Sequence, residues 1–247
     1  MFFIIENGKF YHKHNSVFNI SLSCYCGTQI NGKDMELEIE GMKIEEVGKT
    51  KYLGTTVTKD SLIEDEIKER IAACNRASFA NQKMLQSKLI SKKTKMKLYK
   101  ALVRPAVVYG SECWVLTENI KQKLLVFERK ILRRIFGPTQ KANGEWRLEA
   151  NEEIEEGINN ENIIRYIKYK RLGWLGHIER MTNEKVAKTT YKWKPYEIRL
   201  KGRPRVRWED DVRNDLRKMG VTNWKQTTQE RKKWKEIIEQ AKTHKEL

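Results

Sequence analysis

The spacing of apolar residues changes near residue 58, from every second residue to every third or fourth. Before this point Met35, Leu37 and Ile39 alternate with acidic residues and the chain turns at Gly41-Met42, a pattern typical of a β-hairpin with one wet face. Lys51–Val57 is predicted to form another short strand, interrupted by a glycine. Beyond residue 60 the spacing is helical. The sequence therefore predicts a mainly α fold with a small N-terminal β-hairpin region.

Helix boundaries follow from this spacing together with capping and breaking residues. The clearest helix runs from Thr117 to Phe136 and stops at Gly137-Pro138. Pro105 is expected to kink or end an earlier helix that begins at Ser91 or Thr94. Further helices are predicted from Ser61 to Cys74, from about Glu161 to Met181, from Val206 to Met219 and from about Thr227 to Ala241. A polar connector over 143–160 and a basic loop over 185–204 separate them.

Positive charge is concentrated after residue 57. The chain carries 50 Lys and Arg against 33 Asp and Glu, a net charge of +17. Residues 1–57 hold 6 of the basic and 7 of the acidic residues, so the remainder carries a net charge of +18. We expect a β-rich part over 1–57, a helical domain over 58–142 and a basic helical region over 143–247. The excess of positive charge after residue 57 predicts a polyanionic partner.

The cysteine pattern favours a reducing compartment. Four cysteines at irregular spacing are typical of free thiols rather than of a disulfide framework. The apolar run Met1–Ile5 is too short for the apolar region of a signal peptide, and no stretch approaches the roughly 18 apolar residues of a membrane helix. We therefore expect an intracellular protein of the nucleus or cytoplasm, neither secreted nor bound to a membrane.

Two basic segments are candidates for contact with nucleic acid. The helix from Thr117 to Phe136 carries cations that could lie along a phosphate backbone, although a solvated charged face is the commoner meaning of such a pattern. The segment Lys201–Trp208 combines arginines with an aromatic ring, groups that bind phosphates and stack on unpaired bases. Its alternative is a basic linker whose Trp208 anchors the next helix. The candidate cations are Arg129, Lys130, Arg133 and Arg134 in the helix, and Arg203, Arg205 and Arg207 in the segment.

The sequence predicts no catalytic residue, no metal ligand and no cofactor. Glu209-Asp210-Asp211 falls in the first turn of a predicted helix, where acidic side chains complement the helix dipole. Two histidines and two cysteines supply the residue types of a zinc site, but not a familiar spacing, so a zinc-stabilised binding module is the weakest hypothesis. These residues are His12, His14, Cys24 and Cys26. The sequence contains no nucleophile elbow, phosphate-binding loop or zincin pattern.

Several strings occur in an informative order. They are Lys51-Tyr52-Leu53-Gly54, Lys95-Met96-Lys97-Leu98-Tyr99, Tyr109-Gly110-Ser111-Glu112-Cys113-Trp114, the run from Phe127 to Pro138, the run from Arg171 to Met181, and the run from Gly202 to Asp210. In this order they resemble the end of the palm, the helical thumb and the C-terminal tail of the endonuclease-reverse transcriptases of LINE-like (non-LTR) retrotransposons. The resemblance covers about residues 50–242.

This resemblance implies a helical thumb-like bundle followed by a basic helical tail, which together grip primer-template duplex and element RNA. It implies that Tyr52, Leu53 and Gly54 support the primer end, while the cations of the 117–136 helix line the backbone. The polymerase site of this family is a set of palm aspartates that includes an aromatic-x-Asp-Asp turn upstream of the Lys-Tyr-Leu-Gly strand. No such turn precedes Lys51 here, and neither the fingers nor the endonuclease domain is found, so no catalytic residue is carried over.

Two functions from different classes follow. The first is a nucleic-acid-binding fragment of an RNA-directed DNA polymerase, which binds DNA or RNA but is not expected to polymerise DNA alone. The alternative is a decayed or domesticated fragment that acts as a protein-interaction module or has no selected function. Binding to phosphates depends steeply on salt, so the salt dependence of binding separates the two.

Overall fold

The computed structural model describes the backbone of residues 2–6, 9–13, 37–39, 42–46, 48–58, 63–140, 143–193, 207–244 and 247, and the side chains from residue 48 onward within these ranges. The chain forms two compact units. Unit 1 comprises Met1–Glu66 and Thr182–Arg205, and unit 2 comprises Ile67–Met181 and Val206–Leu247. Unit 2 includes residues on both sides of position 142. The division by composition into 1–57, 58–142 and 143–247 stays a prediction.

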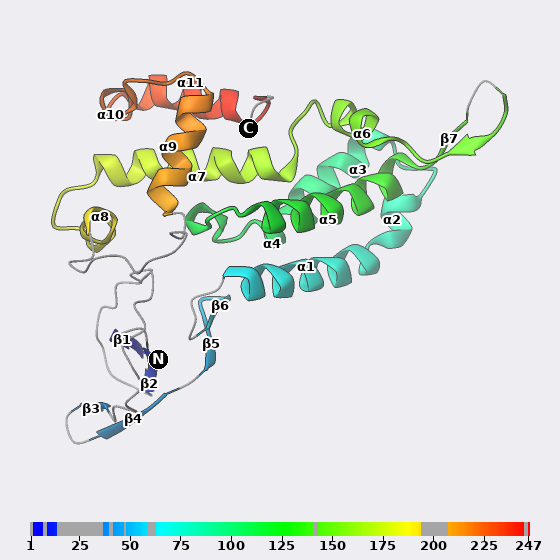
Figure 1. Ribbon diagram of the computed structural model, residues 1–247. Coiled ribbons are helices and arrows are strands. Elements are labelled where there is room, and N and C mark those ends of the chain that lie inside the picture. Colours follow the sequence, from blue (N-terminus) through cyan, green and yellow to red (C-terminus); the bar gives the residue numbers. More distant parts are fainter. Residues whose placement is uncertain are drawn as a thin grey trace. The chain divides into compact units, whose positions relative to one another are not determined.

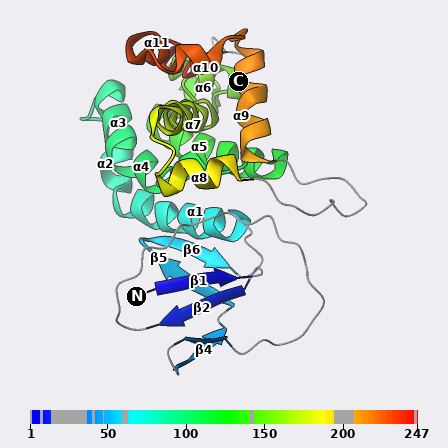
Figure 2. The ribbon, with the colours of Figure 1, turned by 90° about the vertical axis from the view of Figure 1, so that its left-hand side faces the viewer.

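An antiparallel sheet with the strand order β1-β2-β4-β3 forms part of unit 1 (Figure 2). Pairing of Leu37 with Ile44 joins β3 to β4, which confirms the hairpin predicted around Gly41-Met42. The β1-β2 hairpin, in which Phe2 pairs with Lys13, is a new finding, because no period of two is evident in the sequence before residue 30. The strands are β1 (Phe2–Glu6), β2 (Lys9–Lys13), β3 (Leu37–Ile39) and β4 (Met42–Glu46).

A third hairpin in unit 1 replaces the single strand predicted over Lys51–Val57. Strand β5 (Lys49–Tyr52) pairs antiparallel with β6 (Thr55–Thr58), and Tyr52 lies opposite Thr55. The two residues between the strands, Leu53 and Gly54, have φ angles of 47° and 79°. Positive φ at both central positions is the geometry of a tight hairpin turn whose twist matches the strands. The glycine therefore reverses the chain instead of interrupting one strand.

Part of the predicted basic loop is helical. Helix α8 (Val186–Lys192) lies in unit 1, where the sequence predicts irregular structure over 185–204. The hydroxyl of Thr189 donates to the carbonyl oxygens of Asn183 and Lys185, and Lys188 is buried with its ammonium 5.8 Å from the Tyr191 ring centroid. Residues 194–206 of the predicted loop lie outside the described residues.

Unit 2 is built around a central helix, α5, which contacts α2, α3, α6 and α7. Its buried stripe is the one that the sequence predicts, and it includes Ile120, Leu124 and Ile131, all at most 2% exposed. Thr117 caps the helix by accepting a hydrogen bond from the Ile120 N–H. The elements up to this point are α1 (Ile63–Ala80), α2 (Gln82–Gln86), α3 (Lys92–Leu98), the π-helix η1 (Tyr99–Val103), α4 (Arg104–Val107), the 3₁₀ helix η2 (Ser111–Cys113) and α5 (Glu118–Phe136). Glu66 and Ile67 of α1 mark the boundary between the units.

The helix predicted to begin at Ser91 or Thr94 begins after Ser91. The Ser91 hydroxyl accepts a hydrogen bond from the Thr94 N–H at 3.2 Å, so Ser91 is its N-cap. The helix does not end at Pro105. The wider π turn η1 precedes this residue, and Pro105 occupies the first turn of α4, where no intrahelical N–H donor is required. The run of helix thus extends to Val107.

The second half of unit 2 contains two helices that the sequence does not predict, α6 and the short α10. Helix α6 lies within the connector predicted over 143–160, and it buries a single large apolar side chain, Ile154. Helices α7 and α9 confirm the predicted helices over 161–181 and 206–219, and α11 confirms the last one with a later start. The elements are β7 (Thr139–Gln140), β8 (Trp146–Arg147), α6 (Asn151–Gly157), α7 (Ile163–Arg180), α9 (Trp208–Lys218), α10 (Trp224–Thr227) and α11 (Arg231–Ala241).

Helix α7 runs beside α11 and is crossed by α9 (Figure 1). Gly176 of α7 faces the indole of Trp234, which is 1% exposed and donates a 3.1 Å hydrogen bond to the Leu172 carbonyl oxygen. A buried ion-pair cluster joins α7 to α9, with 2.7 Å between Lys168 Nζ and Asp215 Oδ1. Removal of one partner from such a cluster would leave a buried charge uncompensated between α7 and α9.

The observed elements confirm a mainly α fold with a small N-terminal β region. Within the described ranges, no helix is both long enough and apolar enough to cross a membrane.

Candidate nucleic-acid interface

The four cations predicted on the 117–136 helix fall into two groups in α5. Arg129 forms an ion pair with Glu155 at 3.0 Å, and Arg133 donates a 2.8 Å hydrogen bond to the Asn151 side-chain oxygen. Both contacts attach α5 to α6. These two arginines therefore link α5 to α6, and their predicted role along a phosphate backbone stays a prediction.

Lys130 and Arg134 form the second group. Lys130 is exposed and Arg134 is half-exposed, and they stand one turn apart on the same face of α5. Neither side chain makes an ion pair with another residue that the structure describes. Of the four predicted cations, these two are therefore the ones without an ion-pair partner among the described residues.

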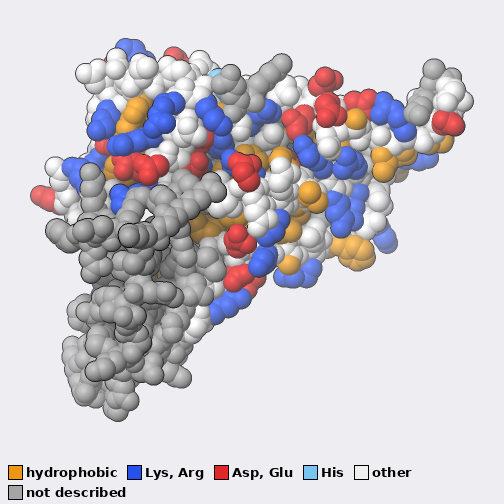
Figure 3. Space-filling view, in the orientation of Figure 1, with side chains coloured by type: hydrophobic (Ala, Val, Ile, Leu, Met, Phe, Trp, Pro, Cys, Tyr) orange, Lys and Arg blue, Asp and Glu red, His pale blue; other side chains and the backbone are white. Residues whose placement is uncertain are grey.

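A larger group of exposed cations lies on the helices that precede α5. The 42 residues from Arg70 to Ser111 contain ten Lys and Arg and no Asp or Glu. Most of these cations lie on or between α1, α2 and α3, and in Figure 3 Lys and Arg side chains gather over the part of unit 2 that holds α2, α3 and α5. Six of the ten are exposed. They are Arg76, Lys83, Lys88, Lys92, Lys93 and Lys97, here called the α1–α3 cation group.

No member of the α1–α3 cation group forms an ion pair with a residue of the described ranges. Lys92 lies 5.7 Å from the Phe136 ring centroid, which places the start of α3 beside the end of α5. Helices α2 and α3 pack on α5 through buried residues such as Leu85, so their lysines sit on a rigid support. Uncompensated cations on fixed helices are the arrangement that releases counterions from a polyanion.

Of the four remaining cations of this segment, Lys95 is buried and the other three bind groups within unit 2. Lys100 and Arg104 both bind Glu161, at 2.8 and 2.6 Å, and the Arg104 guanidinium lies 3.8 Å from the Tyr166 ring centroid. Arg70 donates to the Ala106 carbonyl oxygen at 3.3 Å. These contacts tie α1, η1 and α4 into the bundle, so the total charge of the segment overstates its available charge.

The α1–α3 cation group was not predicted, although the sequence contains a signal for it. A helix with both charge signs resembles a solvated face, but 42 residues without one acid do not. The lack of acids over residues 70–111 is therefore the signal that indicates this segment. The cations of α5, in contrast, lie on one clear amphipathic helix.

The Lys51-Tyr52-Leu53-Gly54 string forms the end of β5 and the hairpin turn in unit 1. Leu53 is 73% exposed at the tip of this turn, while Tyr52 is half-buried. A leucine with φ of 47° is unusual, because a left-handed backbone brings its Cβ close to the following carbonyl oxygen. The turn therefore presents an apolar side chain to solvent at a conformational cost that Asn or Gly would avoid.

Arg203 and Arg205 lie outside the described residues, so their predicted role stays a prediction. Arg207 precedes the first residue of α9 and is half-buried. Trp208 anchors this helix, since its indole N–H donates a 2.8 Å hydrogen bond to the Glu112 carbonyl oxygen. Of the two interpretations of Trp208, the anchor agrees with the structure.

The acidic residues at the start of α9 have structural partners. Asp211 accepts a 2.7 Å hydrogen bond from the Arg171 guanidinium and a 3.3 Å hydrogen bond from the Leu116 N–H, and Glu209 pairs with Arg213. Trp208-Glu209-Asp210-Asp211 matches an aromatic-x-Asp-Asp string in letters, but it forms a helical turn rather than a strand turn. In the ranges that the structure describes, no three His, Cys, Asp or Glu residues cluster to hold a metal ion. The predicted zinc alternative rests on side chains outside those described.

Comparison with known proteins gives information about the evolutionary origin of this chain. A transposon-derived protein of Caenorhabditis elegans, itself uncharacterized, is 26% identical to this chain over 208 residues, which cover 82% of the chain and 74% of the relative. No protein-family profile matches the chain, and no solved structure matches it significantly. The similarity to the nematode protein suggests a transposon origin for this chain.

Proposed function

We propose that this chain is a nucleic-acid-binding fragment of a retrotransposon reverse transcriptase, which grips primer-template duplex or element RNA and has no polymerase site of its own. The observation that carries the proposal is the α1–α3 cation group, six exposed cations in a segment without acids. Lys130 and Arg134 of α5 add to it. The ordered strings that resemble a thumb and tail, and the similarity to a transposon-derived protein, support the same origin.

Phosphate contacts supply most of the affinity of a sequence-independent binder, and each contact releases condensed counterions. We expect binding to DNA duplex, and to RNA, whose affinity falls steeply as salt rises. The proposal assigns to Leu53 a separate role at the primer end, where an exposed apolar side chain could pack against the terminal base pair.

A pair of lysines on α3 tests the role of the cation group. Lys93→Gln with Lys97→Gln removes two exposed charges one turn apart and leaves the buried face of α3 unchanged. Fluorescence anisotropy with a labelled 20-base-pair duplex, repeated at several salt concentrations, should show weaker binding. The slope of log affinity against log salt should decrease in magnitude by roughly 2, since each phosphate contact contributes about 1.

The matched control is Lys232→Gln with Lys235→Gln on α11, which removes the same charge from another exposed helix face. Helix α11 and its N-cap also carry Glu230, Glu236 and Glu239, so its cations are partly balanced. If both pairs change the slope equally, the effect is one of net charge and the cation group is not the interface. If affinity for the wild-type protein barely changes with salt, the proposal fails.

The alternative function, a protein-interaction module, has one observation in its favour. Phe79, Met84 and Leu89 are 72%, 40% and 97% exposed within the same basic segment. A contiguous patch of exposed apolar side chains is typical of a surface that contacts other molecules, and these three residues are the candidates for such a patch. Salt-independent binding to a protein partner, together with no measurable binding to duplex at low salt, would favour this alternative.

We also expect no primer extension by the purified chain, because the resemblance carries over no palm aspartate. Incubation with a primed RNA or DNA template, Mg²⁺ and deoxynucleotides should leave the primer at its original length. Extended products would contradict this part of the proposal.

A further inference from the structure

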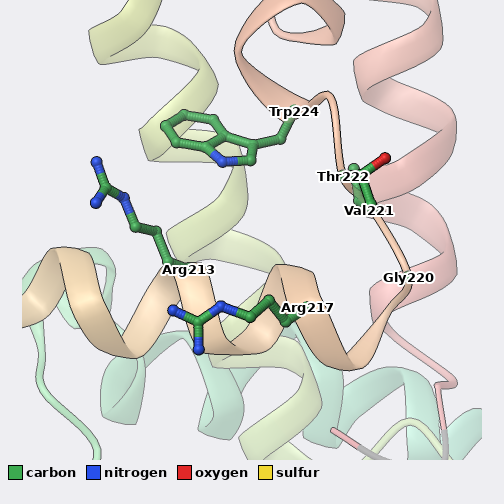
Figure 4. A pocket seen from close by; sticks show the side chains of 6 residues that line it. All are labelled: Arg213, Arg217, Gly220, Val221, Thr222 and Trp224. Atoms are coloured by element: carbon green, nitrogen blue, oxygen red, sulfur yellow. The ribbon is translucent and has the colours of Figure 1, made fainter.

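A cavity of about 350 Å³ lies in unit 2, beside the C-terminal end of α9. Figure 4 shows that two of its side chains come from α9, whereas the others belong to the segment that follows this helix. Among the residues that the structure describes, no carboxylate lines the cavity. Its lining residues are Arg213, Arg217, Gly220, Val221, Thr222 and Trp224.

The local sequence explains why these side chains meet. Arg213 and Arg217 are four residues apart, so they share one face of α9. Gly220 adopts a φ of 72°, and the chain reverses there. The Gly220 N–H donates to the Arg217 carbonyl oxygen and the Val221 N–H to the Leu216 carbonyl oxygen, both at 3.0 Å, which is the Schellman pattern of a helix end. This reversal brings Trp224 back across from the two arginines.

The charged side chains at the cavity differ in whether they already have partners within the protein. Arg213 forms an ion pair with Glu209 and lies 5.8 Å from the Trp224 ring centroid. Arg217 is exposed, and its guanidinium makes no ion pair or hydrogen bond with a residue that the structure describes. Lys225 places a further cation 5.7 Å from the Trp224 ring centroid. The indole itself is half-buried, so part of its surface is open.

We propose that this cavity binds one unpaired nucleotide of a single-stranded nucleic acid, with the base stacked on Trp224 and the adjacent phosphate held by Arg217. A guanidinium fork matches a phosphate in two hydrogen bonds, and an indole offers a flat surface to any base. Arg213 adds positive charge beside the ring, and Thr222 offers a hydroxyl to a sugar or base edge. The proposal deepens the proposed nucleic-acid binding and rests on it.

Unit 2 would then bind nucleic acid in two ways, along a duplex backbone and at an unpaired base. The α1–α3 cation group supplies positive charge but no aromatic ring in a cavity, and charge alone is sufficient to bind the phosphate backbone of a duplex. The α9 cavity supplies both positive charge and an aromatic ring, so it is suited to an unpaired base. A duplex hides its base faces in the stack, so loss of Trp224 should affect single strands and leave duplex binding unchanged.

Anisotropy with a labelled 20-nucleotide oligo(dT), beside the 20-base-pair duplex, tests the proposal. Trp224→Leu should weaken oligo(dT) binding about 5-fold or more, since base stacking on an aromatic ring contributes about 1–3 kcal/mol. Arg217→Gln should also weaken oligo(dT) binding, because it removes the guanidinium that holds the adjacent phosphate. Duplex binding should stay within about 2-fold. Trp224→Tyr should retain most oligo(dT) affinity, because a phenol ring also stacks.

Two control variants test whether the loss of oligo(dT) binding is specific to the cavity residues. Trp146→Leu removes a tryptophan that is 68% exposed on β8, and Lys218→Gln removes the exposed cation next to Arg217. Neither residue lines the cavity, so neither change should reduce oligo(dT) binding as the cavity variants do. Irradiation of a 5-bromouracil-containing oligonucleotide with the wild-type protein should crosslink to the Trp224 peptide.

Each result decides between explanations. If the wild-type protein binds neither probe, the proposed function fails. If it binds both with salt-dependent affinity, but Trp224→Leu and Arg217→Gln bind oligo(dT) as the wild type does, only the cavity proposal fails. Equal loss on both probes, or a Trp224→Tyr variant as weak as Trp224→Leu, would also overturn the stacking role.

Discussion

The hydroxyl of Tyr99 donates a 2.7 Å hydrogen bond to the carboxylate of Glu128, and both side chains are buried in unit 2. Glu128 lies in the middle of α5 and also accepts a 2.7 Å hydrogen bond from the N–H of Ile163, the first residue of α7. This carboxylate therefore connects η1, α5 and α7. Burial raises the pKa of Glu128 to about 7, although the hydrogen bonds from Ile163 and Tyr99 oppose the shift.

Stability should fall as the pH rises from about 4.5 to about 7. In this range the folded protein keeps a proton on Glu128 that the unfolded chain releases, because the folded pKa is about 7 and the ordinary value is 4.5. The contribution of this proton to the free energy of unfolding is complete below the ordinary pKa of a glutamate. It is lost as the pH rises through the pKa of Glu128 in the folded protein. Its size is on the order of 3 kcal/mol for a shift of this extent. Urea unfolding at pH 5, 6, 7 and 8 measures it.

Glu128→Gln should flatten this dependence, since an amide does not titrate. Glu156→Gln changes an exposed glutamate of α6 and should leave the wild-type pH dependence in place. The free energies of unfolding of the wild type and the two variants are compared at each pH. The contribution of the histidines is the same in all three proteins and therefore cancels. An unchanged pH slope in Glu128→Gln would show that another group is responsible.

Gly176→Ala should destabilise unit 2, whereas Gly173→Ala should be neutral or stabilising. A Cβ at Gly176 would fall on the Trp234 indole, 3.0 Å from its Cε2 atom and nearer still to Nε1, so α11 would have to move. A Cβ at Gly173, on the same helix, meets nothing within 4 Å. Overpacking costs roughly 1–3 kcal/mol, while alanine in a helix interior is favoured over glycine by up to about 1 kcal/mol. Thermal unfolding followed by circular dichroism measures both, and equal effects would contradict the close packing.

Leu53→Asn should stabilise the β5-β6 hairpin and weaken contact with a primer end. Asparagine tolerates a φ of 47° better than leucine, and Asn-Gly is the preferred sequence for this turn. The gain should be about 1 kcal/mol or less, visible as slower amide exchange of Thr55 and Val57. The variant removes the apolar tip, so binding to a duplex with a recessed 3′ end should weaken relative to a blunt duplex. Equal binding of both duplexes by the wild type would argue against a role for Leu53 at the primer end.

The helices of unit 2 were predictable where local signals agree. Thr117 as N-cap, a regular apolar stripe and Gly137 as a terminator all indicate the same helix, and α5 forms between them. The signal fails for α6, a seven-residue helix with one buried apolar residue, because its stability comes from packing on α5. It also fails at Leu53, where the left-handed backbone contradicts the residue's own preference.

The sequence by itself determined the mainly α fold, the position of most helices and the excess of positive charge after residue 57, since these depend on period and composition. Only the tertiary structure decided which cations remain available. Arg129 and Arg104 pair with Glu155 and Glu161, partners 26 and 57 residues away in the chain, while Lys93 meets no acid in the described ranges. An ion pair forms only when folding brings opposite charges within a few ångströms, and sequence spacing does not report that distance across a bundle.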